Sequence, residues 1–321
     1  MQAHPTRVAV VGSGYMGGGI AQVLALAGAE VHLADVDAAT AEAARRRLID
    51  QAGAFERAGL FAAGSAERID AGLRSAESIE AAVAAADYVT EAVPEVREIK
   101  LAALERISRA AAPATVIGSN TSAIPIAELQ AAVEVPERFL GVHWMNPAPF
   151  VPGVELIPTP VTDPAAVETA RALLVAAGKR PAQVADSPGF VANRLQFALY
   201  REALLMVEEG LATAEQIDTI VANTFGFRLA LFGPFAIGDM AGLDVYDAAF
   251  ATLERAYGPR LSAPASLREQ VAAGRLGTKA GGGFLDIPAG DVPPLLDYRD
   301  RAYAALSALR TELGAAPGLG A

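Results

Sequence analysis

The 321-residue sequence contains no cysteine, only three histidines and no long uninterrupted run of apolar residues. Without cysteine the chain has no disulfide framework, no thiolate metal site and no cysteine nucleophile. No segment reaches the ~18 consecutive apolar residues of a membrane span. The apolar run 8–11 stops at Gly12, which is too early for a signal peptide. We therefore expect a cytoplasmic protein without a metal site or a membrane partner.

Positive charge is also scarce, because 26 Lys and Arg stand against 37 Asp and Glu and the formal net charge is −11. Non-specific nucleic-acid binding needs a basic surface that releases counterions, so no nucleic-acid partner is predicted. With 52% hydrophobic and 20% charged residues, the composition is that of a globular protein. The length suits about two domains.

The first part of the chain alternates short apolar runs with helical stretches. Such alternation predicts parallel strands joined by right-handed crossovers, with helices on both faces of one sheet. The sequence therefore predicts an α/β, doubly wound Rossmann domain over residues 1–186. The expected strands and helices lie at 8–11, 17–27, 30–34, 38–57, 88–89, 97–111, 115–117, 139–142 and 164–177.

The alternation ends at the turn residues 185–190, and helical patterns follow. The stretch 191–209 is apolar and uninterrupted, which predicts a helix buried on most of its surface. Further helices are expected at 213–223, 243–257 and 266–273. We expect an all-α C-terminal domain over residues 187–321. The apolar surface of this domain exceeds what one copy can bury, so we expect a homodimer. The expected partner besides a second copy is a small-molecule substrate.

Residues 12–17, Gly-Ser-Gly-Tyr-Met-Gly, fit the G-x-G-x-x-G pattern between an expected strand and an expected helix. Such a turn lets a pyrophosphate approach the backbone and the free N–H groups at the start of the helix. Asp35 follows Gly12 by 23 residues, close to the ~20 typical of a ribose-binding carboxylate. A carboxylate there accepts from a 2′-hydroxyl and repels a 2′-phosphate. The pattern predicts NAD rather than NADP, the alternative being a structural glycine turn beside a solvated aspartate.

His143 ends the expected strand 139–142, and the carboxyl ends of parallel strands are where open sheets bind ligands. Glu155 lies among apolar residues, where a carboxylate needs a partner. An imidazole is the natural one, because a carboxylate on one ring nitrogen fixes the tautomer and raises the basicity of the other. From spacing alone, a structural histidine and a solvated carboxylate remain alternatives.

Several motifs occur in one fixed order along the chain. They are 12–17, Asp35, 91–95, 119–122, 143–147 with Glu155, 186–194 and the closing segment Gly-Thr-Lys-Ala-Gly-Gly-Gly-Phe at 277–284. Together these motifs resemble the L-3-hydroxyacyl-CoA dehydrogenase family over about residues 7–286.

The resemblance implies roles for four residues. His143 resembles the general base that takes the alcohol proton as hydride leaves for the nicotinamide, and Glu155 the carboxylate that orients it. Ser122 matches the serine that bonds the reacting oxygen, and Asn193 the amide that polarises it. Fixed neutral donors of this kind stabilise an alkoxide-like oxygen. Taken alone, Ser122 could equally be a helix cap and Asn193 a cap or surface amide.

The resemblance also implies which residues contact the cofactor NAD. Glu91 and Lys100 resemble cofactor-side contacts, a surface pair of Glu91 with an arginine being the alternative. The full expected set is Gly12, Gly14, Tyr15, Met16, Gly17, Asp35, Glu91, Lys100, Asn120 and Asn146.

The sequence departs from the family near the acyl carrier. Members that use CoA carry a serine and basic residues on the helix after the ribose acid, whereas residues 49–57 contain no serine and one cation. Glu95 after Pro94 resembles the lambda-crystallin-like L-gulonate and carnitine dehydrogenases, which oxidise free 3-hydroxy acids. In that case Arg201 or Arg228 could pair with the substrate carboxylate.

We therefore expect an NAD-dependent oxidoreductase of a 3-hydroxyacyl-CoA, such as 3-hydroxybutyryl-CoA, in fatty acid metabolism. Oxidation of a free 3-hydroxy acid is the first alternative, and a non-catalytic, crystallin-like or NAD-sensing protein is the second. The β-hydroxyacid dehydrogenases that use a lysine fit poorly, because Lys179 and Lys279 lie outside the first long helix after the domain boundary.

Overall fold

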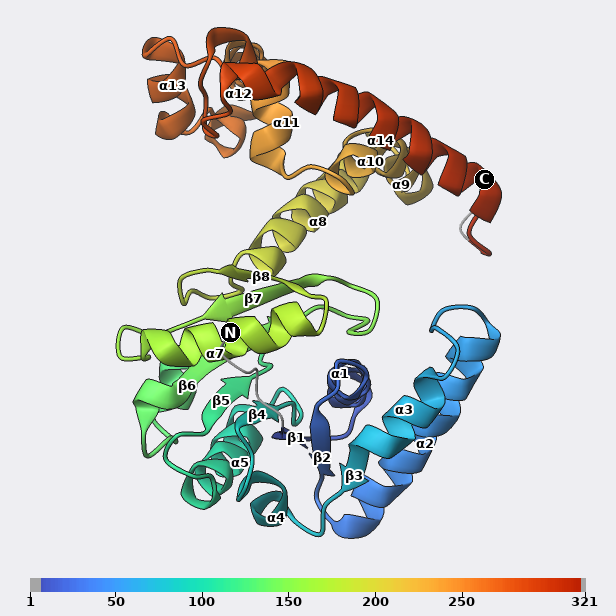
Figure 1. Cartoon of the computed structure of the whole chain (residues 1–321). Coiled ribbons are helices and arrows are strands. Elements are labelled where there is room, and N and C mark those ends of the chain that lie inside the picture. Colours follow the sequence, from blue (N-terminus) through green and yellow to red (C-terminus); the bar gives the residue numbers. More distant parts are fainter. Residues whose placement is uncertain (1–6, 319–321) are drawn as a thin grey trace. The chain divides into compact units, whose positions relative to one another are not determined.

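The computed structural model describes residues 7–318. These residues form two compact units, one up to Ala198 and one from Leu199 onward (Figure 1). Among them, no helix combines the length and apolar character needed to cross a membrane.

The first unit is built on one eight-stranded sheet with the order β3-β2-β1-β4-β5-β6-β7-β8. Every neighbouring pair is parallel except β6 and β7, which are antiparallel. The strands are β1 (Arg7–Val11), β2 (Glu30–Ala34), β3 (Leu73–Ser75), β4 (Tyr88–Glu91), β5 (Val116–Ser119), β6 (Phe139–Trp144), β7 (Gly153–Ile157) and β8 (Arg180–Gln183).

Helices cover both faces of this sheet (Figure 1). Val8 and Val10 of β1 enter one buried cluster and Ala9 and Val11 the other, because successive side chains of a strand point to opposite faces. The doubly wound domain predicted from the alternation is confirmed. Its helices are α1 (Tyr15–Leu26), α2 (Ala38–Arg57), α3 (Ser65–Gly72), α4 (Ile79–Val83), α5 (Arg97–Ala110), α6 (Ile126–Gln130), the 3-10 turn η1 (Pro136–Arg138) and α7 (Pro164–Ala176).

The second unit is entirely helical, as predicted. Its helix of 22 residues near the end of the described chain, α14, was not expected from the sequence. The elements are the second half of α8 (Ala192–Glu208), α9 (Ala214–Asn223), α10 (Phe225–Leu229), α11 (Pro234–Ala241), α12 (Leu243–Tyr257), η2 (Gly258–Leu261), α13 (Ala265–Ala272), η3 (Thr278–Ala280), η4 (Ala289–Asp291) and α14 (Val292–Leu313).

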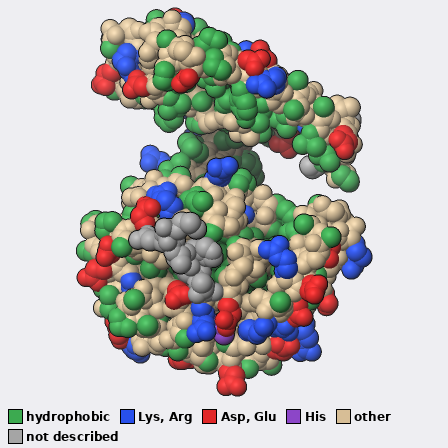
Figure 2. Space-filling view, viewed as in Figure 1, with side chains coloured by type: hydrophobic (Ala, Val, Ile, Leu, Met, Phe, Trp, Pro, Cys, Tyr) green, Lys and Arg blue, Asp and Glu red, His purple; other side chains and the backbone are tan. Residues whose placement is uncertain are grey.

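The helix α8 differs from its prediction in burial, because none of its residues is buried in the single chain. Its apolar side chains are exposed instead, and in Figure 2 hydrophobic side chains gather on the visible face of the helical unit. The buried cluster within this unit is small and consists of Leu243, Ala263 and Leu267.

Along the sequence, the boundary between the two units lies inside α8, after Ala198. The sequence analysis places the domain boundary at residue 186. The start of α8 is held to the first unit by hydrogen bonds. Glu155 accepts from the N–H groups of Val191 and Ala192, and the Asn193 side chain donates to the carbonyl of Ser122. These contacts are tertiary, so the turn residues at 185–190 could not reveal them.

Candidate active site

The turn between β1 and α1 has room only for glycine at two positions. Gly12 has a φ of +100°, and a Cβ there would lie 2.5 Å from the carbonyl oxygen of Ala92. A Cβ on Gly17 would lie 1.9 Å from the carbonyl oxygen of Gly12. Helix and strand therefore pack as closely as the G-x-G-x-x-G pattern requires.

A cavity of about 860 Å³ opens at this turn, along the carboxyl ends of β1, β2, β4 and β5. No side chain caps the start of α1, so its N–H groups remain for an anion. Both the volume and the donor set suit a dinucleotide. The lining includes Gly12, Ser13, Gly14, Tyr15, Met16, Asp35, Ala92, Val93, Pro94, Glu95, Asn120 and Ser122.

Asp35 closes the cavity at the end of β2. Its Oδ2 accepts from the N–H and the hydroxyl of Ser13, at 2.7 and 2.5 Å, and its Oδ1 accepts from the N–H of Val36 at 2.8 Å. The carboxylate is thus fixed against the glycine turn, where it places negative charge at the edge of the cavity.

Replacing Asp35 by Ala should raise the KM for NAD about tenfold, which is the scale of one lost hydrogen bond to a charged group. It should also narrow the preference for NAD over NADP, because the charge that repels a 2′-phosphate is gone. Asp35→Asn is the matched control, because it also removes the negative charge but keeps an oxygen that can accept from Ser13. Steady-state titration of both cofactors checks this, and an unaltered preference in both variants would refute the ribose assignment.

Glu91 and Lys100 do not line this cavity, in contrast to their prediction as cofactor contacts. Their side chains are 0% and 1% exposed, and Lys100 Nζ lies 2.8 Å from Glu91 Oε1. The second oxygen of Glu91 accepts from the Ser119 hydroxyl at 2.5 Å. A buried pair with satisfied hydrogen bonds supports the ends of β4 and β5 from behind the cavity wall.

Glu95, unlike Glu91, lines the cavity, and sequence reasoning did not assign it a role in the site. Its Oε1 accepts from the Thr121 hydroxyl at 2.6 Å and from the N–H groups of Ser122 and Ala123 at 2.8 and 3.0 Å. Its Oε2 lies 3.3 Å from Lys100 Nζ. Glu95 therefore fixes the turn that carries Ser122. The signals in the sequence are its place in the 91–95 motif and its position just after a strand that ends at the sheet's carboxyl edge.

The pKa of Glu95 lies below its ordinary value. Burial by itself would raise this pKa, but the hydrogen bonds from the turn and the Lys100 ammonium outweigh that effect. A lowered pKa means that the ionised carboxylate stabilises the fold above the ordinary glutamate range, and that this stability is lost as pH falls through the lowered value.

Glu95→Gln should therefore unfold more readily than the wild type at pH 7 and lose less additional stability between pH 7 and pH 4. Urea unfolding of both proteins at the two pH values checks this. The same drop in both proteins would show that the Glu95 carboxylate does not stabilise the turn.

His143 and Glu155 face each other across the antiparallel pair β6–β7, where they occupy directly opposite register positions. His143 Nδ1 lies 2.8 Å from Glu155 Oε2, and the two residues are 4% and 6% exposed. Within the described chain, the other ring nitrogen, Nε2, makes no hydrogen bond. The predicted pairing is thus present in the structure, with one imidazole nitrogen held and the other available.

Glu155 also connects this pair to the start of α8. Its second oxygen accepts from the N–H groups of Val191 and Ala192 at 2.9 and 3.0 Å. The preceding residue, Phe190, is 1% exposed, has a φ of +48° and places its ring 5.6 Å from the His143 imidazole. Backbone strain in a buried aromatic residue beside the pair is typical of a functional site.

Asn193 and Ser122, the two predicted donors to the reacting oxygen, are hydrogen-bonded to each other. Asn193 Nδ2 donates to the backbone carbonyl of Ser122 at 2.8 Å, and Ser122 lines the cofactor cavity. Asn193 directly follows Val191 and Ala192, whose N–H groups donate to Glu155, so the start of α8 links all four predicted catalytic residues.

The two predicted asparagines differ in placement. Asn120 lines the cavity, and its Oδ1 accepts from the N–H of Trp144 at 2.9 Å, which ties the end of β5 to β6 beside His143. Asn146 is exposed, precedes a cis peptide bond to Pro147 and is not part of the cavity wall. The structure therefore does not place Asn146 at the cofactor.

This arrangement suits proton transfer beside a bound dinucleotide. A buried imidazole with one free nitrogen is linked through Glu155 and the start of α8 to Asn193 and Ser122, and the oxidation of an alcohol by hydride loss needs a base and neutral donors of these types. Over residues 7–318, no three His, Asp or Glu side chains are grouped as a metal site would require.

Family models match almost the whole described chain. Residues 7–187 match the NAD binding domain of 3-hydroxyacyl-CoA dehydrogenase, and residues 189–287 match the C-terminal domain of the same family. The cofactor of this family is NAD, in agreement with the cavity at the glycine turn.

Individual relatives agree. A 5-formyl-3-hydroxy-2-methylpyridine 4-carboxylate 5-dehydrogenase of Mesorhizobium japonicum is 37% identical over 86% of this chain and 89% of its own length. A probable 3-hydroxybutyryl-CoA dehydrogenase of Bacillus subtilis is 34% identical over 87% of this chain and 96% of its own. A solved 3-hydroxyacyl-CoA dehydrogenase of Archaeoglobus fulgidus covers 94% of this chain and 99% of its own, with a TM-score of 0.77 and 29% identity. The chain therefore belongs to the 3-hydroxyacyl-CoA dehydrogenase family.

Proposed function

We propose that the chain interconverts the secondary alcohol at C3 of a 3-hydroxyacyl substrate and the corresponding ketone. The observation that carries this proposal is the His143–Glu155 hydrogen bond, which leaves Nε2 free to exchange a proton with the alcohol. Bound NAD supplies the chemistry of accepting hydride from C3.

The residues of the chain transfer the proton and stabilise the reacting oxygen. His143 takes the hydroxyl proton at Nε2 as C3 loses hydride, and Glu155 stabilises the imidazolium that forms. The Ser122 hydroxyl and the Asn193 amide donate to the reacting oxygen as negative charge develops on it. In the reverse direction His143 returns the proton to that oxygen.

A second cavity supports a CoA thioester, such as 3-hydroxybutyryl-CoA, as the substrate. It has a volume of about 360 Å³ and shares Gly14 and Tyr15 with the cofactor cavity. Arg47 on α2 contributes a guanidinium to its wall, which suits a phosphate of the carrier. The apolar side chains of Phe55 and Phe150 suit the thioester arm.

A free 3-hydroxy acid is the second candidate, and the same cavity favours it in one respect. Arg47 is its one cation, and that guanidinium already donates to the Ser13 carbonyl at 2.6 Å. A CoA molecule carries several phosphate charges and needs more positive partners than this. The Mesorhizobium japonicum relative is, by its name, a dehydrogenase of a pyridine carboxylate.

A panel of matched thioesters and free acids tests the proposal. NADH absorbance is followed with 3-hydroxybutyryl-CoA and 3-hydroxybutyrate, and then with L-carnitine and L-gulonate. We expect the highest kcat/KM with the thioester, and Arg47→Gln should lower that value more than it lowers the value for the free acids, which Arg47 affects only through its contact with Ser13. A higher kcat/KM for a free acid would establish the second candidate. No turnover of any substrate, combined with tight NAD binding, would indicate an NAD-sensing protein.

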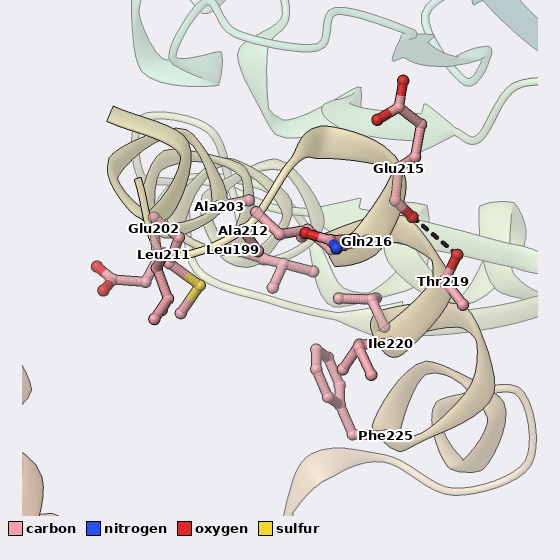
Figure 3. A pocket seen from close by; sticks show the side chains of 13 residues that line it. Leu199, Glu202, Ala203, Leu211, Ala212, Glu215, Gln216, Thr219, Ile220 and Phe225 are labelled. Atoms are coloured by element: carbon pink, nitrogen blue, oxygen red, sulfur yellow. Dashed lines mark hydrogen bonds between the residues drawn. The ribbon is translucent and has the colours of Figure 1, made fainter. Parts of the chain in front are cut away.

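We further propose that the helical unit forms a homodimer. An apolar groove of about 620 Å³ lies between α8 and α9, and Figure 3 shows Leu199, Leu211, Ile220 and Phe225 around it. Leu199, Leu211 and Ile220 are 45%, 62% and 61% exposed in the single chain. An apolar surface of this kind is typical of a protein–protein interface.

Sedimentation velocity tests the dimer. The wild type should sediment as a dimer at micromolar concentration, and Ile220→Glu should shift it to the monomer. Ala249→Glu, on the exposed side of α12, is the control and should stay dimeric. A wild type that is monomeric at these concentrations would contradict the proposal.

A further inference from the structure

Lys179 is a buried lysine to which the proposed mechanism gives no part. It lies between α7 and β8 and is 5% exposed. Its Nζ donates to the carbonyl oxygens of Ala148 and Val151, at 2.5 and 2.8 Å, and lies 5.5 Å from the centroid of the Trp144 ring. Within residues 7–318, no carboxylate forms an ion pair with it.

An ammonium group buried without a carboxylate partner costs free energy. Burial lowers the pKa of Lys179, which means that the ammonium is less stable relative to the neutral amine in the folded chain than in a free lysine. The cost of charging it is present below the folded-state pKa and is relieved as pH rises through that value. Two carbonyls and an aromatic face offset part of this cost. An apolar side chain at this position would avoid the free-energy cost of burying a charge. The presence of a lysine therefore points to a role for the contacts that its ammonium makes.

Those contacts hold one loop. The loop 145–152 connects β6 to β7, so it begins two residues after His143 and ends three residues before Glu155. Lys179 binds this loop at two carbonyls and, through Trp144, contacts the residue next to His143.

The same loop forms a wall of the second cavity. Pro147, Ala148, Pro149 and Phe150 line it, opposite the side chains from α2. The loop also packs tightly on α1, because a Cβ on Gly19 would lie 3.0 Å from Cδ of Pro149. A shift of this loop would therefore change the substrate cavity and the strand ends that carry His143 and Glu155, whereas no residue of the loop lines the cofactor cavity.

We propose that Lys179 is a positioning residue of the dehydrogenase reaction, which holds the 145–152 loop so that the His143–Glu155 pair and the substrate cavity keep their reactive geometry. This inference rests on the proposed function, since it concerns the same catalytic pair. It assigns Lys179 no contact with the substrate or with NAD.

The single tryptophan of the chain allows a test that does not depend on turnover. Trp144 is 3% exposed, and it is the only tryptophan in the sequence, so the protein's tryptophan fluorescence reports on the end of β6, where this loop begins. Lys179→Met keeps the length and apolar stem but loses both hydrogen bonds. Lys179→Arg keeps the charge and the donors. Arg171→Met is the matched control, since it removes a partly exposed cation of α7 that pairs with Glu168.

In Lys179→Met we expect acrylamide to quench Trp144 more strongly than in the wild type. We also expect kcat/KM for the hydroxy substrate to fall about tenfold, since small misplacements of reacting groups have effects of at least this size. The Kd for NAD should be unchanged. Lys179→Arg should recover part of both losses, and Arg171→Met should match the wild type in all three measurements.

Several results would overturn the inference. Lys179→Met with wild-type quenching and wild-type kcat/KM would show that the loop does not need the ammonium. Equal losses of NAD binding and turnover would show a general structural role, as would a failure of both Lys179 variants to fold. If the wild type turns over no hydroxy substrate, the proposed function fails, and the quenching of the two variants still decides whether Lys179 holds the loop.

Discussion

Replacing His143 by Gln is expected to lower kcat by about 10²–10⁴-fold, the range that positioned acid–base catalysis contributes. The Gln side chain can still bond Glu155 but cannot exchange a proton at the Nε2 position. The Kd for NAD should stay at the wild-type value, because His143 is not part of the cofactor cavity. Steady-state kinetics together with a fluorescence titration of NADH measures both quantities.

Ser122→Ala is the companion variant for this prediction. It removes a donor to the reacting oxygen but leaves the base in place, so its loss of kcat should be smaller than that of His143→Gln. Parallel loss of turnover and NAD binding in His143→Gln would mean that the imidazole supports the fold rather than the reaction. The assignment of the base would then be wrong.

Glu155→Gln is expected to have the second largest effect, a loss of about 10²-fold or more in kcat. An amide in place of the carboxylate can donate to Nδ1 of His143, which favours the tautomer with hydrogen on Nε2. In that tautomer Nε2 cannot accept the alcohol proton, and a wrong tautomer is known to be costly in comparable acid–base pairs. The amide oxygen can still accept from Val191 and Ala192, so the fold should remain.

Glu155→Ala separates the two roles of this carboxylate. It should lose turnover and, in addition, about 1–3 kcal/mol of stability, since the N–H groups of Val191 and Ala192 lose their acceptor. Thermal unfolding and kcat are measured for both variants. Wild-type turnover in Glu155→Gln would show that the carboxylate does not control the imidazole.

The sequence predicts the first unit well because its patterns are local. Buried strands such as β1 are short apolar runs, and the glycine turn combines with Asp35 at a spacing set by one strand–helix–strand unit. The strand β7 was not predicted. A run of five residues also does not indicate whether a strand pairs in the parallel or the antiparallel direction. The pairing of β7 with β6, which places Glu155 opposite His143, is a tertiary property.

The parts of the site that escaped prediction depend on long-range hydrogen bonds. Glu91 and Glu95 lie only four residues apart in the sequence. Glu91 is nevertheless buried behind the cavity wall, whereas Glu95 lines the cavity. Lys179 contacts a loop about 30 residues away in the chain, as its bonds to Ala148 and Val151 show. Neither the different burial of the two glutamates nor the contact of Lys179 with the loop produces a pattern in the composition or spacing of the sequence.

The central claim is that hydride passes from C3 of a hydroxyacyl substrate to NAD while His143 takes the proton. Its most direct test uses 3-hydroxybutyryl-CoA and free 3-hydroxybutyrate, each carrying deuterium at C3, with mass analysis of the cofactor after turnover. The account predicts deuterium in the NADH formed by the wild type, and about 10²-fold or more slower formation of labelled NADH with His143→Gln. Deuterium released to the solvent, or equal rates of labelled NADH formation by both proteins, would contradict it.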